Sequence, residues 1–128
     1  MLVLDSTILI DYLRGRPAAD RLIALADADE LLATTAINEE EIARGVLPKE
    51  EVAARAFFSG LIVLAIGEDE AWQAGTWRRN AAQRGETLSQ ADCLIASATL
   101  LAGARLVTGN PKDFATFPIP VEHWPVGM

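Results

Sequence analysis

Short apolar runs alternate with longer helical patterns along the whole chain, and this alternation limits the fold more than any other feature. We predict strands at 1–4, 31–34, 61–66, 105–108 and 119–121. We predict helices at 6–14, 17–28, 37–46, 48–59, 68–84 and 89–102. Alternating strands and helices are typical of βαβ units, in which helices cover a parallel sheet. The sequence therefore predicts an α/β fold, an α/β/α sandwich with a central parallel sheet of four to five strands.

The length and composition predict a single domain, residues 1–128. A chain of 128 residues with 51% hydrophobic residues can bury one ordinary core. No repeat, linker or low-complexity tract divides it. The end of the chain, "FPIPVEHWPVGM", holds three of the six prolines, which favours an edge strand followed by an irregular segment.

Three features predict a cytoplasmic protein without a membrane anchor. The longest apolar runs are shorter than a membrane span requires, and the first residues lack the basic region of a signal peptide. Cys93 is the single cysteine, so no intramolecular disulfide forms, and we expect a buried thiol. The net charge of −7 argues against a general basic surface for nucleic acid. It permits a metal-dependent nuclease or a basic protein partner.

Acidic side chains follow the predicted strands or begin the helices next to them. Asp5 follows the first strand, and Asp113 follows the fourth together with Asn110. Glu41 lies at the edge of the apolar face of its helix, whereas Asp92 is the one acid of a helix that is apolar nearly all round. Because ligands of open α/β sheets bind at the carboxyl ends of the strands, we expect these side chains to converge there.

Each acid also has an ordinary structural explanation. Asp5 with Ser6 and Thr7 is typical of a helix N-cap. Ser89 with Asp92 forms a Ser-x-x-Asp capping pattern, and the segment Asn110–Asp113 forms a similar helix start. Glu41 fits a solvated helix face. A non-catalytic α/β interaction module whose acids only cap helices is therefore an alternative interpretation.

A metal site explains all the acids together. Converging carboxylates repel one another, and no Lys or Arg lies within eight residues of Asp5 or within seven of Asp92. Mg²⁺ or Mn²⁺ is the partner that oxygen ligands of this kind favour. Such ions support phosphodiester hydrolysis, because a metal-activated water attacks the phosphorus without a protein nucleophile. The sequence has no P-loop, Gly-x-Gly-x-x-Gly motif or Cys/His zinc set.

At these residues the sequence resembles the PIN-domain family and, within it, the VapC-type toxins of type II toxin–antitoxin systems. The resemblance covers essentially the whole chain. "VLDSTILIDYL" is similar to the family's first strand and helix, and "SQADCLIASATL" to its third-acid helix. "TAINEEEIARG" resembles the Glu-Leu-x-x-Gly segment, with Ile42 in place of leucine and Glu41 as the acid. "LVTGNPKDF" resembles the Thr-x-Asn-x-x-Asp-Phe signature.

The resemblance implies an Mg²⁺- or Mn²⁺-dependent endoribonuclease that cleaves RNA as a homodimer. It implies inhibition by a VapB-type antitoxin, in a heterotetramer or larger complex. Asp5 and Asp92 would be the central metal ligands, and Glu41 would bind the metal directly or through water. The fourth position is open between Asp113 and Asn110. The supporting residues expected near the metal or the RNA phosphates are Ser6, Thr7, Thr108, Asn110, Lys112 and Arg44.

An antitoxin requires an apolar groove, which we expect among the helices at 17–28, 37–46 and 48–59. The side chains predicted to line it are Leu22, Leu25, Phe57 and Phe58. An arginine of the antitoxin would reach the acids, because carboxylates attract a guanidinium as well as a metal. A PIN nuclease that processes RNA without an antitoxin is the alternative within enzymes.

Overall fold

Five strands form one fully parallel sheet in the computed structural model, which describes residues 1–127 except 16–19, 23, 26 and 27. The strands are β1 (Leu2–Leu4), β2 (Leu32–Thr35), β3 (Ile62–Leu64), β4 (Arg105–Thr108) and β5 (Val121–His123). Their order is β3-β2-β1-β4-β5, and every neighbouring pair is parallel. The predicted parallel α/β fold is confirmed.

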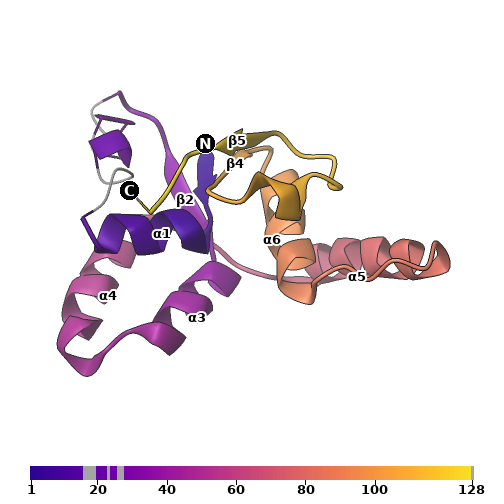
Figure 1. Ribbon diagram of the computed structural model, residues 1–128, viewed down its shortest axis with the longest axis horizontal. Helices are drawn as coiled ribbons and strands as arrows, with labels where there is room; N and C mark the ends of the chain where they lie inside the picture. The colour runs from indigo at the N-terminus through magenta and orange to yellow at the C-terminus, as the bar shows by residue number, and fades with distance from the viewer. Residues whose placement is uncertain (16–19, 23, 26–27, 128) are drawn as a thin grey trace.

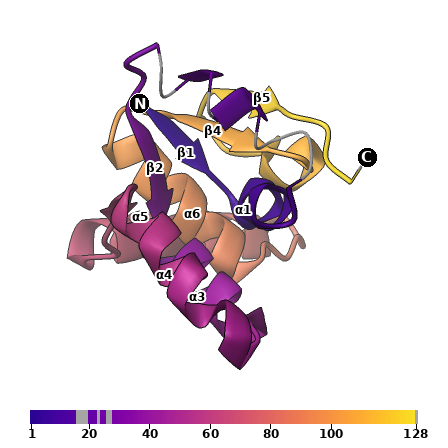
Figure 2. The same ribbon diagram turned by 90° about the vertical axis from the view of Figure 1, so that its left-hand side faces the viewer.

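Helices cover both faces of this sheet. They are α1 (Ser6–Leu13), α3 (Ala36–Gly45), α4 (Glu51–Ser59), α5 (Glu68–Gln83) and α6 (Gln90–Leu101), with 3₁₀ turns η1 (Pro48–Glu50) and η2 (Pro111–Phe114). Leu2 and Leu4 join a core with residues of α1, α3 and α4, whereas Val3 joins a second core with residues of α5 and α6. This alternation along β1 produces the α/β/α layers, with α1 and α4 on one side of the sheet and α5 and α6 on the other (Figures 1 and 2).

The order in which the chain adds strands to the sheet changes direction at β1. From this central strand the chain builds outward to β2 and β3, and it then crosses back to place β4 and β5 on the opposite side. The crevice between the carboxyl ends of β1 and β4 is therefore the topological switch point, where open α/β sheets bind their ligands. Asp5 follows β1 directly, and Thr108 ends β4.

Several predicted boundaries are shifted. The last strand was predicted at 119–121 and lies at 121–123, because Pro118 and Pro120 have no N–H to donate to β4. Pairing begins where the carbonyl of Pro120 accepts the N–H of Leu106 at 2.9 Å. The helix predicted at 48–59 begins as the 3₁₀ turn η1, with Pro48 as its first residue. The helix predicted at 17–28 lies partly outside the described residues.

Two expectations about composition can be compared with the structure. Cys93 is a free, fully buried thiol, as expected. Within the described part of the chain, no helix has the length and apolar character needed to cross a membrane.

The C-terminal segment is held against the switch point. The N–H of Trp124 donates to the carbonyl of Thr108 at 2.9 Å, and the N–H of Gly127 donates to the buried carboxylate of Asp11 at 3.0 Å. Between these two anchors, Val126 packs on Gly109 so closely that a Cβ there would lie 2.6 Å from Val126 Cγ2. Gly109 thus permits the tail to close over the loop that follows β4.

We expect Gly109→Ala to lower the free energy of unfolding by about 1–3 kcal/mol, because the added methyl group overpacks the contact with Val126. Urea denaturation measures this change. The double variant with Val126→Ala should regain part of the lost stability, because it removes the clash with Val126. The regain is partial because the new Cβ still lies 3.2 Å from Thr7 Oγ1. The matched control is Gly75→Ala in α5, where apart from the helix's own backbone and the chain neighbours nothing lies within 4 Å of the new Cβ. This control should instead stabilise the helix, and an equal loss in both variants would contradict the prediction.

Candidate active site

Asp5 is a buried carboxylate at the end of β1 that also caps α1. Its Oδ1 accepts hydrogen bonds from the backbone N–H groups of Thr7 and Ile8, at 3.0 and 3.3 Å, and from the Thr7 hydroxyl. Its Oδ2 accepts one from the hydroxyl of Thr108, at the end of β4. Burial raises the pKa of Asp5, although these hydrogen bonds oppose the shift. The capping interpretation is therefore correct, and the carboxylate is at the same time fixed at the switch point.

The loop after β4 is tied to the same hydroxyl groups. The N–H of Gly109 donates to Thr7 Oγ1 at 2.8 Å, and the N–H of Asn110 donates to Thr108 Oγ1 at 2.9 Å. These two hydroxyls therefore join the beginning of α1 to the end of β4 around Asp5. Thr7 and Thr108, predicted as supporting residues, both contact the first acid.

Glu41 reaches the site from α3. It is half-buried, and its Oε1 accepts a 2.8 Å hydrogen bond from the hydroxyl of Ser6. Glu40 on the same helix is exposed, which agrees with the choice of Glu41 as the inward acid. Ser6 follows Asp5 directly, so this hydrogen bond connects the segments that carry the first two acids.

Asp92 lies in the first turn of α6, where the Ser89 side chain accepts its backbone N–H at 3.2 Å. Its pKa is raised from 3.8 to about 6 by burial, and then by the negative charges of Asp113, Glu41 and Asp5, in that order. These charges come from η2, α3 and the end of β1. The structure thus brings the other three predicted acids close enough to Asp92 to act on it electrostatically.

Asp113 lies on η2, and Asn110 is the N-cap residue directly before this turn. Asn110 Nδ2 donates to Asp113 Oδ2 at 2.8 Å, and both residues are exposed. Asn110 thus orients the fourth acid while Asp113 retains a free face toward solvent. Lys112, between them, is exposed, as is Arg44 at the end of α3. Among the ion pairs of the described residues, neither cation pairs with any of the four acids.

The ligand atoms at this edge of the sheet are carboxylate oxygens, which a hard divalent cation prefers. Among the described residues, no basic side chain forms an ion pair with them. They do not form a closed cage: within the described ranges, no three Asp, Glu, His or Cys side chains meet the spacing that would hold an ion. Mg²⁺ commonly binds one or two carboxylates and keeps several waters. An open set of this kind fits such an ion.

The predicted lining of the antitoxin groove is partly wrong. Leu22 and Phe58 are buried in the first core, and Phe57 stacks on Tyr12 with ring centroids 4.3 Å apart. These side chains therefore stabilise the fold, although Phe58 also lines one of the two cavities described next. An amphipathic pattern marks a face to be buried without distinguishing a core from a partner.

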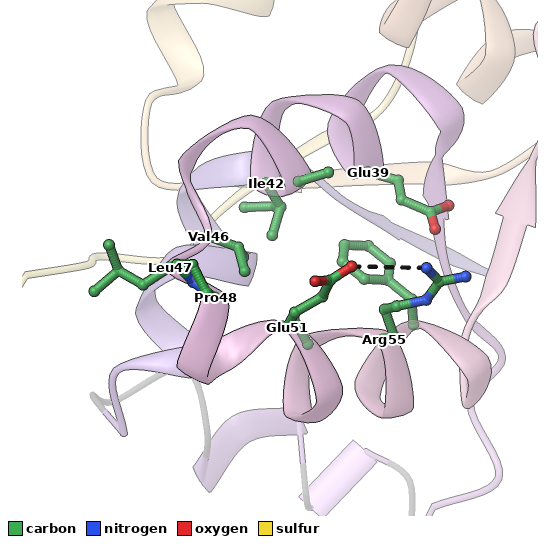
Figure 3. Close-up of a pocket in the computed structure, with 10 residues that line it drawn as sticks. Glu39, Ile42, Val46, Leu47, Pro48, Glu51 and Arg55 are labelled. Carbon is green, nitrogen blue, oxygen red and sulfur yellow. Dashed lines mark ion pairs between the residues drawn. The ribbon is translucent and has the colours of Figure 1, made fainter.

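Two cavities are lined by residues of α3 and α4. One, of about 410 Å³, is lined by α3, η1 and α4, with Glu51 and Arg55 paired at 3.8 Å beside it (Figure 3). The other, of about 390 Å³, lies between α1, α3 and α4, and we call it the α1–α4 groove. Its lining comprises Ile10, Leu13, Arg14, Glu41, Ile42, Gly45, Val46, Lys49, Glu50, Ala53 and Ala54. Because Glu41 is among them, this groove opens on the acidic site.

Sequence reasoning missed Asn38, which is fully buried in the first turn of α3 and donates to Ser6 Oγ at 3.1 Å. A signal was available, because Asn38 lies three residues before Glu41 and so shares its side of the helix. A polar residue at that spacing on a half-apolar helix indicates a buried partner.

The raised pKa of Asp92 predicts how stability changes with pH. The folded protein binds this proton more tightly than the unfolded chain, so the free energy of unfolding falls as the pH rises from 3.8 to about 6. We expect Asp92→Asn to remove this penalty and raise the melting temperature by about 2–6 °C at pH 8 with a chelator present.

Circular dichroism at pH 8 and pH 4 measures this difference, which should vanish at the lower pH. The matched control is Asp69→Asn, an exposed acid in the first turn of α5 that should give no rise. A rise at pH 8 that persists unchanged at pH 4 would contradict the electrostatic cause.

Comparison with known proteins agrees with this architecture. A family model described as PIN domain matches residues 2–119. The chain is 34% identical over 119 residues to Ribonuclease VapC19 of Mycobacterium tuberculosis, covering 92% of this chain and 95% of the relative. One similar solved structure is a toxin–antitoxin complex from Klebsiella pneumoniae, with 27% identity and a TM-score of 0.80 over the whole of both chains. Another is DNA-bound VapBC from Salmonella typhimurium, with 25% identity and a TM-score of 0.81, covering 96% of this chain and 97% of that one. The chain therefore belongs to the PIN-domain family.

Proposed function

We propose that this protein is the toxin of a type II toxin–antitoxin pair, an endoribonuclease that hydrolyses RNA with a divalent metal ion. The relative named as a ribonuclease and the similar toxin–antitoxin complexes support this function. The observation that carries it is the convergence of acids from the end of β1, from α3, from α6 and from η2, where the charges of three of them add to burial in raising the pKa of Asp92. Acids that only cap separate helices do not need to lie close to one another.

We further propose that Asp5, Glu41, Asp92 and Asp113 hold the metal, with Mg²⁺ or Mn²⁺ as the ion. When bound, such an ion lowers the pKa of a water molecule and offsets negative charge on the phosphate. The protein's contribution is orientation: the hydroxyls of Thr7 and Thr108 fix Asp5, Ser6 fixes Glu41, and Asn110 fixes Asp113. Lys112 and Arg44, both exposed, border the path of the RNA phosphates.

Substitution of Asp5 and Asp92, the two site acids whose pKa values are raised, tests the nuclease. We expect Asp5→Asn and Asp92→Asn to lower the rate of RNA cleavage by about 100-fold, because each removes one charged oxygen ligand. Gel-based cleavage of a labelled RNA in Mg²⁺, repeated with a chelator, measures the effect. Asp69→Asn is the matched control and should cleave like the wild type. Wild-type protein that neither binds a divalent ion nor cleaves RNA would instead support the non-catalytic interaction module.

We propose that the antitoxin occupies the α1–α4 groove. Ile10 and Leu13, both large apolar side chains, are exposed there, with Arg14, Lys49 and Glu50 around them. Since Glu41 also lines the groove, an occupant reaches the edge of the acidic site. One ligand could therefore bind the apolar surface and block access to the acids.

Two neighbouring positions of α4 distinguish this groove from the rest of the surface. Ala53 lines it, whereas Val52 is 82% exposed and lines neither cavity. We expect Ala53→Glu to weaken binding of the adjacent antitoxin gene product by about 30-fold or more, because it buries a charge in an apolar contact. Val52→Glu should bind normally. Pull-down after co-expression and calorimetry measure both, and equal affinities for the two variants would place the antitoxin elsewhere.

A further inference from the structure

We infer that Asn38 is a positioning residue that orients Glu41 through the hydroxyl of Ser6. This inference rests on the proposed metal-dependent nuclease and adds to it a residue that does not itself touch metal or RNA. Asn38 has no exposed surface, and its side chain lies between Thr35 and Ser6. Burying a carboxamide is costly unless both of its ends are hydrogen-bonded, as they are here.

The hydrogen bonds run in one direction from β2 to the acid. The hydroxyl of Thr35 donates to Asn38 Oδ1 at 2.8 Å, and Asn38 Nδ2 donates to Ser6 Oγ at 3.1 Å. Ser6 Oγ then donates to Glu41 Oε1 at 2.8 Å. Because a carboxamide nitrogen can only donate, Ser6 must use a lone pair toward Asn38 and direct its own hydrogen elsewhere. The acceptor in its reach is Glu41.

The stability of α3 does not require this arrangement. Thr35 already caps the helix by accepting the N–H of Asn38 at 3.2 Å, and Asn38 has a lower helix propensity than most residues. Its carboxamide instead joins the helix of the second acid to the segment Asp5–Ser6. Residues that orient metal ligands in this way typically change metal affinity or activity by about 10–100-fold when replaced.

Replacement of Asn38 by Val and by Thr, which have nearly the same shape as each other, tests the positioning role. Asn38→Val removes the donor, whereas Asn38→Thr keeps a hydroxyl that can accept from Thr35 and donate toward Ser6. We expect Asn38→Val to weaken Mn²⁺ binding, measured by calorimetry without RNA, by about 10-fold. The kcat for RNA cleavage should fall similarly with an unchanged KM, and Asn38→Thr should recover most of both losses.

Ser6→Ala provides the coupling test. If Asn38 acts through Ser6, this variant should resemble Asn38→Val, and the double variant should lose no more than either single one. The structural control is Thr99→Val, which removes a fully buried hydroxyl that donates within α6 at 2.9 Å. It should lower thermal stability and leave Mn²⁺ affinity unchanged.

The outcomes separate the two claims. Wild-type Mn²⁺ binding and cleavage, with Asn38→Val altered only in stability like Thr99→Val, would overturn the positioning role and leave the nuclease intact. Additive losses in the double variant would overturn it too. Wild-type protein that neither binds Mn²⁺ nor cleaves RNA would overturn both the proposed function and this inference.

Discussion

The hydrogen bond from Thr108 to Asp5 joins the two strands between which the rest of the site is built. These residues are 103 positions apart in sequence, yet β1 and β4 are neighbours at the centre of the sheet. The parallel order places both carboxyl ends at one edge, and the hydroxyl of Thr108 gives the first acid a fixed partner there. The Thr7 contact with Gly109 adds a second link between the same two segments. Every other acid is positioned relative to this centre.

Electrostatic repulsion between the acids opposes the hydrogen bonds that hold the site together. Burial raises the pKa of Asp5, and burial with three neighbouring charges raises that of Asp92 to about 6. The fold tolerates this repulsion because hydroxyl and amide groups orient the carboxylates. Among the described residues, no ion pair supplies these four acids with a cation. Function at such a site and maximal stability are therefore in conflict. The divalent cation that we propose for this site would relieve the repulsion between these carboxylates.

The sequence predicted the parallel sheet and the gathering of the acids, since both follow from periodicity and from where Asp5, Glu41 and Asp92 stand relative to strands. It failed where tertiary contacts decide. Leu22 and Phe58 have the pattern of a docking face but complete the core, and the prolines delay β5 by two residues. Asn38 was missed although it lies three residues before Glu41, because that spacing does not name the partner of its buried carboxamide. Its importance depends on Ser6, which is distant in sequence.

The central position of β1 has a consequence for synthesis. A ribosome makes Asp5 before the partner strand β4, and Thr108 at the end of β4 follows only after more than one hundred further residues. The tail that closes over Gly109 follows later still. A nascent chain therefore cannot assemble the acidic centre while its last strands are unmade.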